Sequence, residues 1–354
     1  MTYDPFARGP FPVGVRTLFP SDAKRGNRSL PIEVWYPAQS SQRGRDLDAA
    51  SKDHFDVIPG FPPVSQDAVR DVAPEPSKYP LVAFSHGFGG HRRQTTFLCT
   101  HLASHGYVVA SVDHTGNTVV DVMQLVMAAQ SGTPIADPLA TVNEFAALRP
   151  ADVGFMVDQI ASATEIGAVA QTNRIGMTGH SFGGWTTLAF TQRDERVHAA
   201  LPLAPAGGKM PPPGDVLSKA LDFNWGRDVP TLYLVADRDS LLPLDGMHEL
   251  LERTRSPKRM AILENADHMH FCDRIEEVHE MFRMMPPPGE FERLAKNVRP
   301  ISELTPPEHA YRFVRGLGLA HMDAHLKGNE SAAKLLAGDV RKLMAERGVK
   351  VTVV

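Results

Sequence analysis

The sequence predicts an α/β fold with a mostly parallel central sheet, helices on both of its faces and lid-type insertions. From residue 81 onward, short apolar runs alternate with longer helix-like segments, and glycines or prolines separate them. This alternation is typical of a parallel sheet, because each helix has to cross a sheet face before the next strand begins. The length of 354 residues and the hydrophobic content of 42% allow one large core. We therefore expect a single domain over residues 1–354.

The N-terminal part predicts two antiparallel strands, at 13–18 and 32–36, with a polar turn at 20–29 between them. Residues 38–79 are rich in loop-forming residues, and prolines recur from Pro59 to Pro80. This stretch joins the second strand to the third. We expect it to be an ordered excursion of the same domain rather than a linker between domains.

The later elements follow in order along the chain. Pro150 is placed at a helix start, because its fixed φ suits the first helical position. The segment 306–327 has the spacing of an amphipathic helix. The predicted strands are 81–85, 107–112, 174–178, 197–203, 231–236 and 260–263, and the predicted helices are 91–105, 150–165, 183–192 and 306–327.

Three insertions interrupt the alternation, at about 114–149, 204–228 and 273–300. The first contains a helix-like run at 118–130, and the other two contain runs of three prolines. All three leave the C-terminal ends of predicted strands, where ligands gather in open parallel sheets. They can form a lid or pocket wall. Surface decoration is an equally good interpretation of any one of them.

The segment Gly179-His-Ser-Phe-Gly183 has the pattern G-x-S-x-G. It lies between a predicted strand and a predicted helix, where a sharp turn would hold Ser181 in a strained conformation. Glycines at 179 and 183 remove the Cβ atoms that would collide across such a turn. Ser181 is therefore predicted to be a nucleophile at the positive end of the following helix. The alternative is a plain glycine turn, which does not need a serine.

A serine nucleophile needs a base and an orienting acid, and in this arrangement the acid and then the base follow the serine along the chain. Asp237 and Asp239 follow the strand 231–236, and Asp239 is preferred because it lies further along the loop. His268 and His270 follow the strand 260–263. His268 is preferred, because His270 is flanked by apolar residues and could line a pocket.

The loop after the strand 81–85 reads His86-Gly-Phe-Gly-Gly90. An oxyanion hole in this arrangement takes one backbone N–H from this loop and one from the residue after the nucleophile. The expected donors are the N–H groups of Phe88 and Phe182. Backbone donors carry no side-chain signature, so a loop shaped only for packing is the alternative.

These motifs resemble the α/β-hydrolases, in the group that joins platelet-activating-factor-acetylhydrolase-like and dienelactone-hydrolase-like esterases. The resemblance covers most of residues 9–272 and is carried by the segments 9–16, 30–37, 84–90 and 179–184. Dienelactone hydrolases use a cysteine nucleophile, whereas this chain has a serine, so the resemblance implies ester hydrolysis by serine. It also implies the triad that the residues indicate on their own, namely Ser181, Asp239 and His268.

We therefore expect a serine carboxylic-ester hydrolase that works through an acyl-enzyme, without a cofactor and without a metal. The expected pocket residues are His86, Gly87, Met269, His270 and Phe271. An amide or peptide hydrolase or an acyltransferase could use the same triad, and a silent binding protein of the same fold is a further alternative. Polymeric esters are possible substrates that nothing in the sequence selects.

The charge and cysteine content limit partners and location. The net charge is −4 with both signs mixed, which does not favour nucleic acid or an anionic membrane as a partner. The sequence contains no stretch of 18 apolar residues, so it does not predict a membrane span. Two cysteines make a disulfide framework improbable, so a cytoplasmic location is expected unless a leader has been removed.

His101 and His105 are spaced for a shared metal but have no third ligand in a supporting position. The oligomeric state is not readable from the sequence.

Overall fold

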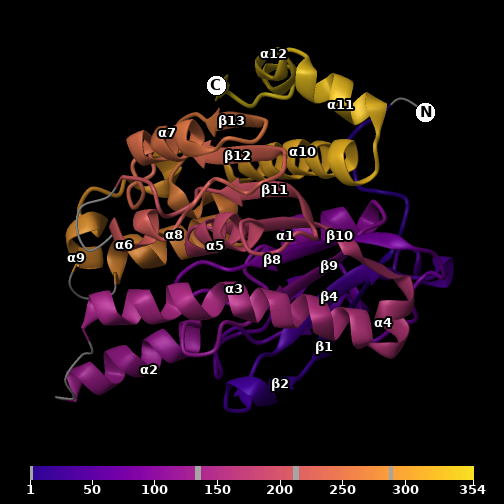
Figure 1. Cartoon of the computed structure of the whole chain (residues 1–354), viewed down its shortest axis with the longest axis horizontal. Helices are drawn as coiled ribbons and strands as arrows, with labels where there is room; N and C mark the ends of the chain where they lie inside the picture. Colours follow the sequence, from indigo (N-terminus) through magenta and orange to yellow (C-terminus); the bar gives the residue numbers. More distant parts are fainter. Residues whose placement is uncertain (1–2, 132–136, 210–214, 287–289) are drawn as a thin grey trace.

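The computed structural model describes residues 3–131, 137–209, 215–286 and 290–354. A ten-stranded sheet forms its centre, with the strand order β14-β13-β12-β11-β10-β8-β9-β4-β1-β7. The strands from β13 to β9 in this order run parallel to one another. The antiparallel pairs are β9–β4, β4–β1 and β13–β14. This mostly parallel sheet between helices confirms the predicted fold class (Figure 1).

The ten strands of the central sheet are β1 (Val13–Leu18), β4 (Ile32–Pro37), β7 (Val69–Arg70), β8 (Tyr79–Ser85), β9 (Val108–Val112), β10 (Ala170–His180), β11 (Val197–Leu203), β12 (Thr231–Ala236), β13 (Lys258–Leu263) and β14 (Val351–Val353). Two short antiparallel pairs lie outside the sheet, β2 (Ser21–Asp22) with β3 (Arg28–Ser29) and β5 (Asp53–Phe55) with β6 (Val64–Gln66). The second pair and β7 lie within the proline-rich excursion, which is therefore ordered.

Each face of the sheet has its own hydrophobic core. One core packs α3 (Pro138–Ser162), α5 (Phe182–Thr191) and α7 (Leu244–Arg253) on the sheet. The other packs α1 (Thr96–Ser104), α10 (Pro307–Leu326) and α12 (Val340–Ala345) on the opposite face. The remaining described α-helices are α2 (Val119–Gln130), α4 (Thr164–Val169), α6 (Asp215–Lys219), α8 (Ile275–Met284), α9 (Glu290–Ala295) and α11 (Glu330–Ala337).

The helix predicted at 91–105 begins only at Thr96, and the largest error in a predicted boundary is at Pro150. Pro150 does not start a helix but lies inside α3, which begins at Pro138 with the Asp137 side chain accepting a hydrogen bond from the Leu139 N–H. An internal proline costs a helix one backbone hydrogen bond and introduces a steric clash. The turns on both sides of Pro150 bury Phe145 and Val153 in the core, and this packing offsets the cost. The first insertion thus ends within a long helix rather than before one.

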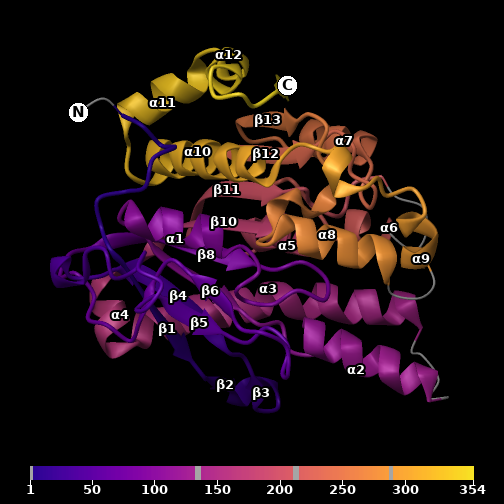
Figure 2. The same cartoon turned by 180° about the vertical axis from the view of Figure 1, so that it is seen from behind.

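The helices of the three insertions gather at one end of the molecule. Both views place α2, α6, α8 and α9 there, away from the chain termini, with α2 alongside α3 (Figures 1 and 2). Of the two proline runs, all of residues 211–213 and residues 287–288 lie outside the described residues. Within the described ranges, no helix is both long and apolar enough to cross a membrane.

Candidate active site

Ser181 occupies a strained turn between β10 and α5. Its φ of 60° and ψ of −117° place it in the left-handed half of backbone space, where side chains other than that of glycine are rare. A Cβ on Gly183 would overlap the Ser85 carbonyl, and one on Gly179 would overlap the Gly183 backbone. The two glycines thus allow β8, β10 and α5 to meet closely. The Ser181 side chain lies at the C-terminal edge of the sheet.

His268 and Asp239 form a pair at the same edge. Nδ1 of His268 lies 2.7 Å from Oδ2 of Asp239, and both side chains are almost fully buried. The other Asp239 oxygen accepts hydrogen bonds from the N–H groups of Leu241 and Leu242, which fixes the carboxylate. Asp237 instead accepts from the Ala266 N–H at 3.2 Å. Of the two aspartates considered from the sequence, Asp239 is the one in contact with His268.

Asp267, which was not predicted from the sequence, joins the loop that carries Asp239 to the loop that carries His268. Its Oδ1 accepts hydrogen bonds from the N–H and hydroxyl of Ser240, both at 2.8 Å, and from the His268 N–H at 2.6 Å. The aspartate caps the 3-10 turn His268–Phe271, and His270 completes the capping box. An aspartate three residues before a histidine was the only available signal in the sequence.

His180 binds the serine turn to the histidine loop. Its Nε2–H donates to the His268 carbonyl at 3.0 Å, and its Nδ1 accepts from Gln94 at 2.7 Å. Burial, together with the neighbouring His268, holds the pKa of His180 well below its usual range, so the ring is neutral. The side-chain oxygen of Gln94 accepts from the Gly87 N–H at 2.7 Å. The neutral ring of His180 and the side-chain amide of Gln94 therefore connect the Gly87 loop, the serine turn and the histidine loop.

The loop after β8 lies against the serine. A Cβ on Gly87, the residue before Phe88, would stand 3.4 Å from the Ser181 Cβ. Phe182 is the first residue of α5, and the N–H groups of a first helical turn have no partner within the helix. The structure thus brings the segments of both expected oxyanion donors to Ser181.

Comparison with known proteins adds to this geometry. The family model described as "Platelet-activating factor acetylhydrolase, isoform II" matches residues 13–133, a stretch that includes the Gly87 loop but ends before Ser181. Cutinase 2 of Thermobifida cellulosilytica is 28% identical over 171 residues, which are 48% of this chain and 52% of that protein. The platelet-activating factor acetylhydrolase of Cavia porcellus is 24% identical over 248 residues, 57% of this chain and 55% of that protein.

A solved structure extends the similarity over nearly the whole chain. The ferulic acid esterase from Streptomyces cinnamoneus has a TM-score of 0.61 and 27% identity, and the match covers 90% of this chain and 91% of that one. The chain has the α/β-hydrolase fold and is similar over most of its length to an esterase. The resemblance drawn from the sequence is thereby confirmed. The chain spans about half the length of the curated relatives it matches.

The expected pocket residues of this α/β-hydrolase differ in their access to solvent. Met269 is half-buried, whereas His86, His270 and Phe271 are fully buried. The His86 ring donates from Nδ1 to the Gly87 carbonyl and accepts at Nε2 from the His114 N–H. The His270 ring bonds the Thr305 carbonyl through Nε2. These contacts favour a supporting role for the buried residues and leave Met269 as the more accessible of the four.

A second set of serine, histidine and aspartate side chains lies in the core, and the sequence interpretation missed it. Oγ of Ser85 is 2.9 Å from Nε2 of His114, and Nδ1 of His114 is 3.0 Å from Oδ2 of Asp152. Arg25 and Arg28 pair with the same aspartate. We call Ser85, His114 and Asp152 the buried group, and Ser181, His268 and Asp239 the edge group. The side chain of each member of the buried group is at most 1% exposed.

Apolar side chains are exposed on the helices near the edge group. Phe88 is 39% exposed, and its ring lies 6.2 Å from that of Phe145 on α3. A Cβ on Gly89 would contact Val122 of α2, so α2 packs on this loop. Among the described side chains of α2 and α8, the exposed large apolar ones are Met123, Leu125, Met127, Met281 and Met284. We call this set, together with Phe88, the apolar rim.

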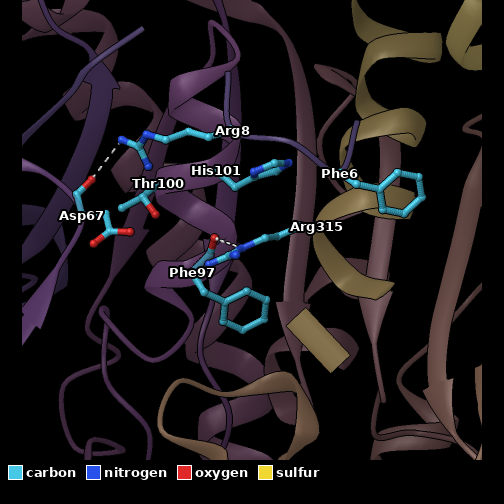
Figure 3. Close-up of a pocket in the computed structure, with 7 residues that line it drawn as sticks. All are labelled: Phe6, Arg8, Asp67, Phe97, Thr100, His101 and Arg315. Carbon is cyan, nitrogen blue, oxygen red and sulfur yellow. Dashed lines mark hydrogen bonds between the residues drawn. The ribbon is translucent and has the colours of Figure 1, made fainter. Parts of the chain in front are cut away.

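A separate cavity of about 100 Å³ lies between α1, α10 and the N-terminal segment (Figure 3). None of its lining residues comes from the loops that carry the edge group. His101 lines it and donates through Nε2 to the Pro5 carbonyl, while His105 contacts the Ala7 carbonyl. Among the described residues, no cluster of three histidine, cysteine or acidic side chains is arranged for a metal ion.

Proposed function

We propose that this chain is a serine carboxylic-ester hydrolase in which the edge group is the catalytic triad. The observation that carries the proposal is the strained Ser181 turn next to the bonded His268–Asp239 pair, with both at the C-terminal edge of one sheet. A conformation as costly as that of Ser181 persists only where the surroundings enforce it. Nucleophiles of this fold occupy such a turn.

In the proposed acylation step, Ser181 Oγ attacks the ester carbonyl carbon while the His268 imidazole takes the hydroxyl proton. The carbonyl π-electrons move onto oxygen, and the N–H groups of Phe88 and Phe182 stabilise this oxyanion. Collapse of the intermediate breaks the bond to the alcohol oxygen, which receives the proton from His268. Asp239 holds the imidazole tautomer and stabilises the imidazolium. Each oxyanion donor contributes roughly 3 kcal/mol in comparable sites.

Deacylation repeats the sequence with water. The neutral His268 takes a proton from water as the oxygen attacks the acyl carbon, and the second intermediate releases the carboxylic acid and free Ser181. The ester and one water molecule supply all the atoms of the carboxylic acid and the alcohol that are released.

We propose that the substrate is a carboxylic ester with an apolar acyl or alcohol group. The names of the relatives, cutinase, platelet-activating factor acetylhydrolase and ferulic acid esterase, have ester hydrolysis in common. The apolar rim is exposed on Phe88 and on two helices of the insertions, and the half-buried Met269 directly follows His268, so both suit an apolar acyl or alcohol group. Hydrophobic contacts discriminate weakly, by about 1–3 kcal/mol per methylene-sized change, so we expect a graded chain-length preference.

A p-nitrophenyl ester series from acetate to long-chain esters tests the function, with p-nitroanilides of the same acyl groups in parallel. We expect ester turnover that an organophosphate abolishes with one label on Ser181, and no effect of EDTA. Faster turnover of the anilides would favour the amide hydrolase. The absence of both turnover and labelling in well-folded protein would favour a silent binding protein.

A further inference from the structure

Arg149 is a fully buried arginine that the proposed mechanism does not use. It lies on α3 and is 1% exposed. Its guanidinium donates to the carbonyl of His86, to the side-chain oxygen of Asn117 and to Oγ of Thr186. A weaker contact of 3.4 Å reaches Oγ of Ser85. All four acceptors are uncharged.

The positive charge of Arg149 is therefore not neutralised by direct contact. Within the described ranges, no carboxylate forms an ion pair with it. Asp152, one turn further along α3, attracts it from a distance but is bonded to Arg25, Arg28 and His114. Burial lowers the pKa of Arg149 to about 9, and at pH 7 the group still carries its proton. A buried charge without a counterion is costly, and in a low dielectric it acts over a longer range than at the surface.

Arg149 contacts both sides of the expected oxyanion hole. Arg149 donates to the carbonyl of the peptide between His86 and Gly87. The next peptide along the chain carries the Phe88 N–H. On the other side, its guanidinium carbon lies 4.5 Å from the centre of the Phe182 ring. Thr186, which accepts from its Nε, lies one turn further along α5 and bonds the Phe182 carbonyl. One side chain thus fixes the residues around both N–H donors.

We propose that Arg149 is a positioning residue that sets the oxyanion hole and supplies a fixed positive charge behind it. The proposal rests on the proposed esterase function. Negative charge develops on the substrate oxygen only as the tetrahedral intermediate forms, so a fixed charge there stabilises the transition state more than the bound ester. Its loss should lower kcat and leave KM nearly unchanged.

Asn117→Asp separates the charge from the packing. The change is nearly isosteric and leaves an oxygen in place to accept from Arg149, but its carboxylate neutralises the guanidinium. Because a new ion pair forms, the thermal midpoint should not fall by more than a few degrees. We expect kcat for p-nitrophenyl acetate to fall roughly 10-fold with KM unchanged. The affinity for a trifluoromethyl ketone, which forms a tetrahedral adduct with the serine, should fall in parallel.

Arg149→Lys and a control complete the test. Lysine keeps the charge but cannot make the same set of contacts, so kcat should fall and the binding of the ketone should weaken. Arg227→Lys is the matched control: Arg227 also donates to backbone carbonyls, those of Thr191 and Asp194, but at the far end of α5. It should leave kcat unchanged. Because Asn117→Asp leaves the arginine in place, the test does not depend on whether an Arg149 variant folds.

Two results would overturn the proposal and are distinguishable. If folded Asn117→Asp and Arg149→Lys keep the wild-type kcat and ketone affinity, Arg149 serves packing alone while the esterase function stands. If the wild-type protein itself neither turns over esters nor binds the ketone, the proposed function fails and this inference fails with it.

Discussion

The edge group and the buried group contain the same three residue types and the same histidine–aspartate hydrogen bond, but their surroundings differ. In the edge group the serine lies at a φ of 60° on a sheet edge and is partly accessible. In the buried group the serine is the last residue of a regular strand and is 0% exposed. Its aspartate also pairs with two arginines, whereas the aspartate of the edge group is held by backbone N–H groups.

We infer from this contrast that a hydrogen-bonded serine, histidine and aspartate are not sufficient for a nucleophilic site. A substrate must reach the serine, and donors must face the position where the oxyanion forms. Ser85 does not meet the first condition, because it is 0% exposed, and Asp152 binds α3 to two arginines of the N-terminal segment. We infer that the buried group stabilises the fold behind the site. Substitutions matched between the two groups test this division of roles.

The two serines should differ most. Ser181→Ala is expected to lower kcat for p-nitrophenyl acetate on the order of 10⁶-fold while the fold stays intact, as for other triad serines. Ser85→Ala should keep activity within about 10-fold and lose about 1 kcal/mol of stability, since it loses one buried hydrogen bond. Steady-state kinetics and urea unfolding measure both. If clean Ser181→Ala retained a tenth of the wild-type rate, the serine mechanism would be wrong.

The aspartate of the edge group is expected to have the next largest effect. Asp239→Asn should cost roughly 10⁴-fold in kcat, because an amide no longer favours the required tautomer of His268. Asp237→Asn is the control in the same loop and should have little effect, since the Asp237 side chain accepts from the Ala266 backbone and not from His268. The opposite order of the two variants would move the acid role to Asp237.

In the buried group, Asp152→Asn should act on stability. The amide of asparagine carries no charge, so the ion pairs of Arg25 and Arg28 with residue 152 are lost. Breaking such a buried pair lowers the free energy of unfolding by about 3 kcal/mol. Asp158→Asn on the same helix is the control: Asp158 is 66% exposed and should cost well under 1 kcal/mol. Urea unfolding gives both values. A lost organophosphate label on folded Asp152→Asn would contradict a purely structural role.

The buried group should also make folding sensitive to acid. Burial, with Arg149 nearby, lowers the pKa of His114 to about 4, below the value of about 6.5 expected in the unfolded chain. Below pH 6.5 the unfolded state thus binds a proton that the folded state does not. Stability should therefore fall by about 1 kcal/mol per pH unit from pH 6.5 down to about 4 for this group alone.

Urea unfolding at pH 7.5, 6 and 5 measures this slope. His114→Gln should reduce it by close to one proton, whereas His54→Gln, at an exposed position, should not change it. An unchanged slope in His114→Gln would mean that other buried histidines account for the acid sensitivity.

The sequence predicted the sheet well, together with the strand ends where the edge group lies, because each depends on local patterns. Ser181, Asp239 and His268 each follow a short apolar strand, and parallel strands bring their C-terminal ends together. The boundary at Pro150 failed because tertiary packing outweighed a local helix rule. Helix α7 and strand β14 were not predicted either.

The buried group and Arg149 could not be predicted for a different reason. Their members are far apart in sequence and come from β8, the loop after β9, and α3. No short motif connects Ser85 to His114 or Asp152. A buried arginine also looks like an ordinary surface residue in a sequence, because only the fold decides which polar side chains lose contact with water.

The smallest expected effect concerns Met269, a partly accessible side chain beside the edge group. The buried group has no access to solvent. Met269 follows His268 and is half-buried, so a larger side chain there should narrow the space for the substrate. Met269→Trp should shift the preference between acetyl and long-chain p-nitrophenyl esters by about 10-fold, the size of one or two methylene contacts. Turnover of the acetyl ester should hardly change. Phe271→Leu is the contrasting variant: Phe271 is fully buried against the His180 ring, so its loss should slow all esters alike. If Met269→Trp also slowed acetyl and long-chain esters equally, Met269 would support the triad rather than contact the substrate.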